Sequence, residues 1–131
     1  MEPDAFFEKI VADAVDGLPA WAHEAMENVA FVVEREVRRK RAGEIGIKMH
    51  EVLLGLYEGI PKTERTRGYF GVPPDKITIF QKPLEQLAGG DPAKLKRLVR
   101  DTVWHEVGHH LGLDETELRA IETRKGRRSR K

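Results

Sequence analysis

Two histidines and one glutamate near the end of the chain have the spacing of a metal-dependent hydrolase. Residues 105–109 read His-Glu-Val-Gly-His, the HExxH pattern. On a helix, His105 and His109 lie about 40° apart and one turn along the axis, so both imidazoles can converge on one zinc ion. Glu106 points about 80° away from the pair. A carboxylate there can act as a general base toward water without binding the metal.

The residues after this motif contain carboxylates that could complete the metal site. Gly112 stands three residues after the motif, where a left-handed glycine would end the helix and turn the chain back toward the metal. Asp114 and Glu117 are spaced as a capping box that opens a last helix. Because that role occupies Asp114, we predict Glu115 as the third zinc ligand, with water in the fourth position. Asp114, Glu117, Glu122 or no protein ligand at all remain the alternatives.

The other candidate residues have plainer interpretations. His110 lies about 100° from His109 and close to the apolar side of the helix, so we expect it to pack or to form hydrogen bonds. His23 and His50 are far from the motif in sequence, and neither is expected in the site. The spacing identifies no donor for an oxyanion. The residues that could serve are Tyr57, Arg65 and Tyr69, for which packing is the simpler interpretation.

The motif lies in the strongest predicted helix of the sequence. Asp91 is a favourable N-cap, and Pro92 suits the first helical position. Apolar residues then recur at helical spacing, which predicts a helix that packs against a sheet. This stripe contains Leu95, Leu98, Val99, Val103, Val107 and Leu111.

Three segments predict the strands of that sheet. They are residues 28–34, 52–57 and 76–81. Since Pro74 and Pro83 flank the last segment, we expect it at a sheet edge, where an extended peptide could pair with it. The Gly- and Pro-rich stretch 58–75 is predicted as a long loop that forms a wall of the cleft.

Two helices are predicted before the first strand. Apolar positions recur at helical spacing from Asp4 to Asp16, and a second short helix is expected from Pro19 to Glu27. The charged run 35–44 has no interleaved aromatic residues, so we expect a solvated connection rather than a nucleic-acid patch.

Composition restricts the classes of protein that fit. The chain of 131 residues is 40% hydrophobic and 34% charged, which predicts one globular domain over residues 1–123. It has no cysteine, so a metal site must use His, Asp and Glu. No apolar run reaches the roughly 18 residues of a membrane span, and the start shows no signal-peptide pattern. We therefore expect a cytoplasmic protein. The scarcity of Asn, Gln and Met is similar to the usage of heat-tolerant proteins.

Basic charge is concentrated at the end of the chain. Residues 124–131 contain six basic and no acidic residues, whereas residues 1–123 contain 17 basic and 22 acidic residues, a net charge of −5. We expect residues 124–131 to be a disordered tail, with weak binding to a polyanion as the alternative. No other nucleic-acid contact and no membrane contact are expected.

Three stretches carry a family resemblance: TVWHEVGHHLGLDE (102–115), LLGLYEGIPKTER (53–65) and PDKITIFQKPLE (74–85). In them the chain resembles the small bacterial zincin-like metallopeptidase family, over about residues 5–123. The resemblance implies an α+β, zincin-like fold, in which a small mixed sheet of three to four strands packs against the active-site helix, with additional N-terminal and C-terminal helices. The metzincin methionine after the motif is missing.

The resemblance also assigns roles to the motif residues. It implies His105 and His109 as zinc ligands, Glu106 as the catalytic acid/base, and Glu115 as the third ligand, where family members commonly have Asp. We therefore predict a peptidase with one zinc per chain that acts on short or unfolded peptides. Zinc would polarise the scissile carbonyl, and Glu106 would pass a proton from the water to the leaving amine.

The alternative is a non-catalytic zinc-binding or regulatory module, whose basic tail docks on a nucleic acid or an acidic partner. The presence of Glu106 favours the peptidase, because a domain that only holds metal has no need of a carboxylate at that position.

Overall fold

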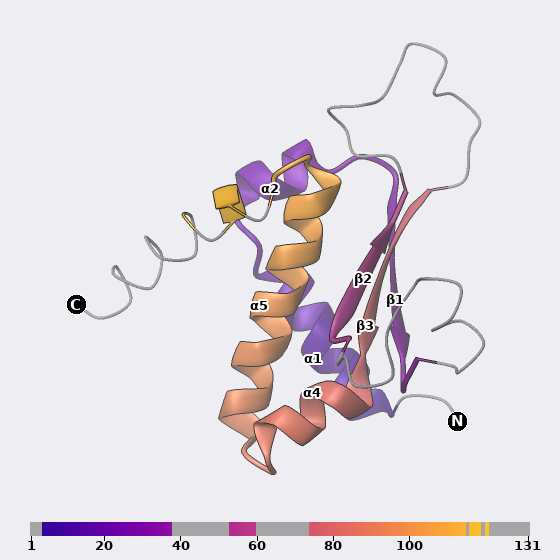
Figure 1. The fold of residues 1–131 in the computed structure, drawn as a ribbon, viewed down its shortest axis with the longest axis vertical. Coiled ribbons are helices and arrows are strands. Elements are labelled where there is room, and N and C mark those ends of the chain that lie inside the picture. Colours follow the sequence, from indigo (N-terminus) through magenta and orange to yellow (C-terminus); the bar gives the residue numbers. More distant parts are fainter. Residues whose placement is uncertain (1–3, 38–52, 60–73, 115, 119, 121–131) are drawn as a thin grey trace.

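The structure is a computed structural model that describes residues 4–37, 53–59, 74–114, 116–118 and 120. In these ranges the arrangement is α+β. In chain order the helices and strands are α1 (Ala5–Asp16), α2 (Ala20–Ala25), β1 (Val29–Glu34), β2 (Gly55–Glu58), β3 (Asp75–Phe80), α4 (Gln81–Ala88) and α5 (Pro92–His110). The strands thus follow α1 and α2 and precede α4 and α5. Figure 1 shows α5 lying along the sheet, with α4 near its start and α2 near its end.

The three described strands form one mixed sheet with the order β1-β3-β2. β1 pairs with β3 in parallel, and β2 pairs with β3 antiparallel, with Gly55 opposite Ile79. The small mixed sheet packed against a long helix confirms the predicted fold class.

The strand predicted at residues 76–81 is the central strand of this sheet, so its predicted edge position is wrong. β3 has a partner strand on each side, and its residues 77–80 are fully buried. The flanking prolines do not conflict with this place. Pro74 precedes the first residue of β3, and Pro83 lies in the first turn of α4, where a missing N–H breaks no helical bond.

Helix α4 is absent from the sequence prediction, and Gln81, the last residue of the predicted strand, begins it. Leu84 and Ala88, one helical turn apart, are buried and hold this short helix against the core. Gly89 ends it in the left-handed conformation, with φ 60°. The two-residue turn Gly89-Gly90 then leads to the N-cap of α5.

Two predicted boundaries near the sheet are also corrected. β2 covers Gly55–Glu58, so it is shorter at its start than the predicted strand 52–57. The predicted loop 58–75 is too long by one residue at each end, because Glu58 belongs to β2 and Asp75 to β3. Residues 60–73 lie outside the described residues, and the wall of the cleft stays a prediction.

The N-terminal helices agree with the sequence prediction, and α1 has a strong cap. Asp4 accepts a hydrogen bond from the backbone N–H of Phe7 at 2.7 Å and another from the Gln81 amide at 2.7 Å, which joins α1 to α4. These two bonds, the first more than the second, hold the pKa of Asp4 below its ordinary value. The stabilisation from this cap is therefore complete at neutral pH and is lost as the pH falls through the lowered pKa.

The core lies where α1, α5 and the sheet meet. Its buried members on α1, β3 and α5 include Phe7, Ile10, Val11, Ile77, Ile79, Leu95, Val99, Val103 and Val107. The predicted stripe of α5 is thus buried, with Leu98 and Leu111 partly covered at its margins. Trp21 of α2 packs edge-to-face on Trp104 of α5, with ring centroids 5.6 Å apart. Within the described ranges, no helix has both the length and the apolar character needed to cross a membrane.

Candidate active site

Helix α5 places the two histidines of the motif side by side. Its start is fixed by Asp91, whose side chain accepts from the backbone N–H groups of Ala93 and Lys94. Near its other end, the ring centroids of His105 and His109 are 4.8 Å apart, with the ring planes at 81°. Both residues are half-buried. This pairing fits two imidazole ligands of one zinc ion.

Glu106 lies against β2 and is only 8% exposed. A Cβ atom at Gly55 would lie 3.1 Å from Glu106 Cγ and 2.7 Å from Thr102 Cγ2. Helix α5 and strand β2 therefore approach each other closely here, and glycine is required for that approach. The side chain of Glu106 thus packs against β2, which among the described strands lies at an edge of the sheet.

Gly55→Ala is expected to lower the free energy of unfolding by about 1–3 kcal/mol, because the new methyl group overlaps Thr102 and presses on Glu106. Denaturant unfolding measures this loss. Gly17→Ala serves as the matched control, since the backbone at Gly17 has φ −78° and a Cβ there would meet only backbone oxygens, the nearest at 3.2 Å. Equal losses in the two variants would contradict a special role for Gly55.

The chain turns back sharply after α5, as predicted from Gly112. Gly112 has φ 88°, the left-handed conformation. The N–H of Leu113 donates to the carbonyl of Gly108 at 2.9 Å, and the N–H of Gly112 donates to the carbonyl of His109 at 3.0 Å. These two bonds form a Schellman motif. The reversal brings the buried side chain of Leu118 into the space that a Cβ atom at Gly108 would occupy.

Gly108→Ala is expected to destabilise the protein by about 1–3 kcal/mol, although alanine favours a helix by about 1 kcal/mol over glycine. The steric overlap with Leu118 outweighs the gain in helix propensity, so the free energy of unfolding should fall. A double-mutant cycle with Leu118→Ala tests this reason, because the smaller side chain leaves room for the methyl group. In that background Gly108→Ala should stabilise; a loss there would contradict the explanation.

Asp114 and Glu117 form the predicted capping box. The N–H of Glu117 donates to Asp114 Oδ1 at 2.8 Å, and the N–H of Asp114 donates to Glu117 Oε1 at 3.3 Å. Residues 116–118 are helical. Both carboxylates are therefore engaged at the start of the last helix. Glu115, the predicted third ligand, and the alternative Glu122 lie outside the described residues.

His110 faces the sheet instead of the histidine pair. It is fully buried, its Nδ1 lies 2.9 Å from Asp75 Oδ2, and its Nε2 accepts the backbone N–H of Glu27 at 3.2 Å. Its prediction as a hydrogen-bonding residue is confirmed. The Tyr57 hydroxyl donates to the same oxygen of Asp75 at 2.6 Å, so it is used in the core and does not point at a substrate.

The remaining candidates from the sequence are not brought to the motif by the described structure. His23 is exposed in the last turn of α2. His50, Arg65 and Tyr69 lie outside the described residues.

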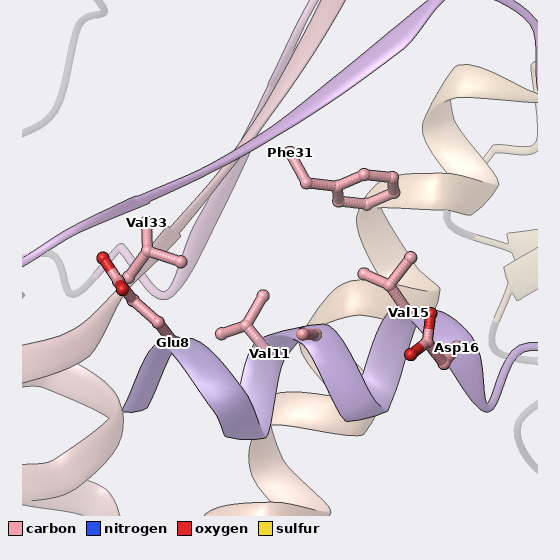
Figure 2. A pocket seen from close by; sticks show the side chains of 7 residues that line it. Glu8, Val11, Val15, Asp16, Phe31 and Val33 are labelled. Carbon is pink, nitrogen blue, oxygen red and sulfur yellow. The ribbon is translucent and has the colours of Figure 1, made fainter. Parts of the chain in front are cut away.

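A hollow of about 380 Å³ lies between α1 and β1, away from the motif (Figure 2). The side chains around it are mainly apolar, with Glu8 and Asp16 at its two ends. The lining residues are Glu8, Val11, Ala12, Val15, Asp16, Phe31 and Val33. The hollow borders β1, whereas Glu106 packs against β2, and β3 lies between these two strands in the described sheet. It contains no histidine, and we do not assign the chemistry to it.

The donor set fits zinc as far as the structure describes it. Two imidazoles one helical turn apart are typical zinc ligands, and the chain has no cysteine to compete. Within the described ranges, no group of three or more His, Cys, Asp or Glu residues is placed to hold a metal ion. A third protein ligand would therefore come from a residue outside those ranges, such as Glu115.

Comparison with known proteins points to the same region of the chain. The model of a family described as zincin-like metallopeptidase matches residues 26–125. The matched range begins directly after α2 and contains the sheet, α4, α5 and the HExxH motif. It starts later than residue 5, where the resemblance inferred from the sequence begins, so α1 and α2 lie outside it. The search of curated proteins found no match.

Proposed function

The chain belongs to the zincin-like metallopeptidase family, and from this premise we propose that it is a zinc-dependent peptidase that acts on short or unfolded peptides. The observation that carries the proposal is the arrangement on α5. The paired histidine rings are 4.8 Å apart, and the intervening Glu106 is nearly buried and packs against β2. In this proposal His105 and His109 bind one zinc ion, Glu115 is the third ligand, and Glu106 is the general base.

The chemistry divides between the metal and Glu106. Zinc in such a site supplies a Lewis acid that polarises a peptide carbonyl and makes a water molecule more acidic. Glu106 accepts the proton of the attacking water and delivers it to the leaving amine. Its packing against Gly55 holds the carboxylate in one place, so that the base does not have to be ordered during the reaction.

The strand predicted to pair with an extended peptide, β3, is central, and of the two outer described strands β2 is the one that packs against Glu106. In the described part of the chain, β2 pairs with β3 on one side only. The backbone of Gly55 lies next to Glu106. We propose that the substrate adds to the other side of β2 as a further strand, because main-chain hydrogen bonds there would bring a peptide bond close to the base.

Metal analysis combined with a peptide-library assay tests the proposal. The purified chain is expected to bind one zinc and to cleave peptides, with cleavage abolished by a zinc chelator and restored by added zinc. A chain that binds zinc but cleaves no peptide would support the non-catalytic module instead. A chain that binds no zinc would contradict both.

A further inference from the structure

One buried network joins the end of α5 to three other segments. Its centre is Asp75, the first residue of β3, which is 1% exposed. Asp75 Oδ2 accepts from the Tyr57 hydroxyl of β2 at 2.6 Å and from His110 Nδ1 of α5 at 2.9 Å. The backbone N–H of Asp75 donates to the carbonyl of Asn28, directly before β1, at 2.9 Å. The three described strands and α5 thus meet at this residue, because Asp75 is also the register partner of Val29 in β1.

The hydrogen bond at Nε2 of His110 determines which ring nitrogen carries the proton. Because Nε2 accepts the N–H of Glu27, it is unprotonated, and the proton lies on Nδ1 and is donated to Asp75. Both nitrogens of a fully buried ring are therefore occupied. A turn of the ring in either direction would leave buried polar groups without partners, which is costly.

The Asp75 carboxyl group is also packed closely against Gly59, which restricts its movement. Gly59, directly after β2, has φ 154°, and a Cβ atom there would overlap the Asp75 carboxyl group. The backbone of Gly59 therefore lies against that carboxyl group. The network holds the end of β2, the start of β3 and the last residue of α5 in fixed relation.

We propose that Asp75 and His110 are positioning residues for the metal-binding histidines, an inference that rests on the proposed function. His109 lies in the last turn of α5, where helices fray. The next residue, His110, anchors that turn to β3 and to Glu27. The anchor holds the ring of His109 at a constant position relative to His105, which lies one turn deeper in the helix.

Two substitutions at His110 distinguish the effect of its hydrogen bonds from the effect of its shape. His110→Phe keeps a ring of similar size but removes both hydrogen bonds, whereas His110→Gln keeps one donor and one acceptor. Gln81→Met is the matched control. Gln81 is also buried, at 2% exposed, and its side chain forms hydrogen bonds with Asp4 and Glu85. It lies at the other end of β3, about 20 Å from Asp75.

The measurements are the zinc dissociation constant, by competition with a chromophoric chelator, and the visible spectrum of the cobalt-substituted protein, which reports ligand geometry. We expect His110→Phe to weaken zinc binding about tenfold or more and to change the cobalt spectrum. His110→Gln should restore most of the affinity. Gln81→Met should leave both readouts unchanged, even where its melting temperature falls.

The possible failures are distinguishable. If the parent chain binds zinc and His110→Phe binds it equally well with the same cobalt spectrum, the positioning role is wrong and the proposed function stands. If His110→Phe and Gln81→Met weaken zinc binding alike, the network serves stability alone, and the positioning role is again wrong. A parent chain that binds no zinc overturns the proposed function and the positioning role together.

Discussion

Glu106→Gln is expected to fold and to bind zinc like the parent chain, but to cleave peptides at least about 10²-fold more slowly. The amide has the shape of the carboxylate, so it can keep the close packing against Gly55. It cannot accept a proton from water at neutral pH. Because Glu106 is not one of the proposed zinc ligands, the loss should appear in turnover while the zinc content stays constant.

The control for this variant is Glu24→Gln, which makes the same chemical change at an exposed position of α2. It should cleave at the parental rate. Zinc content and thermal unfolding are measured on all three proteins, and a chelator identifies cleavage by contaminating proteases. Equal chelator-sensitive rates for the parent and Glu106→Gln would remove Glu106 from the mechanism and favour another base.

Local signals made α5 and its end predictable. The Asp91 cap, the proline after it, the apolar stripe and Gly112 each act within a few residues of the chain. The capping box of Asp114 and Glu117 is also a local signal, since the two residues are three positions apart. The fold agrees with the sequence prediction at these points because each signal depends on one or two turns of backbone and on no distant partner.

The place of β3 in the sheet depends on partners that are distant in sequence. Its residues 77–80 are fully buried and, apart from Thr78, apolar, which fits a strand buried on both faces and is typical of a central strand with a parallel neighbour. The flanking prolines suggested an edge instead, although Pro83 belongs to the next helix. The composition of the strand was therefore a better guide than the residues around it.

The network around Asp75 could not be predicted for a similar reason. Its members Glu27, Tyr57, Asp75 and His110 come from four separate parts of the chain and meet only when the sheet and α5 are assembled. A weak signal was present, since Asp75 opens an apolar strand and His110 lies near the buried stripe of its helix. A buried acid and a buried histidine each need a partner, and each is the simplest partner for the other.

Glu115→Ala is expected to weaken zinc binding by more than the roughly 10- to 100-fold that loss of an outer-shell partner costs, because it removes a proposed ligand. Asp114→Ala should keep the zinc site and instead destabilise the last helix by about 0.5–2 kcal/mol. The division follows from the capping box, in which Asp114 Oδ1 accepts the N–H of Glu117 at 2.8 Å. A carboxylate used in that bond is less free to bind zinc than its neighbour.

Zinc titration and thermal melts of the two variants decide between the adjacent carboxylates. Glu115→Asp adds a third comparison, since it keeps a carboxylate at the ligand position and should retain more of the zinc affinity than Glu115→Ala. If Asp114→Ala loses the metal while Glu115→Ala keeps it, the ligand is Asp114 and the capping box must open when zinc binds. If both keep it, the third ligand comes from another part of the chain, and the turn at Gly112 serves the helix end alone.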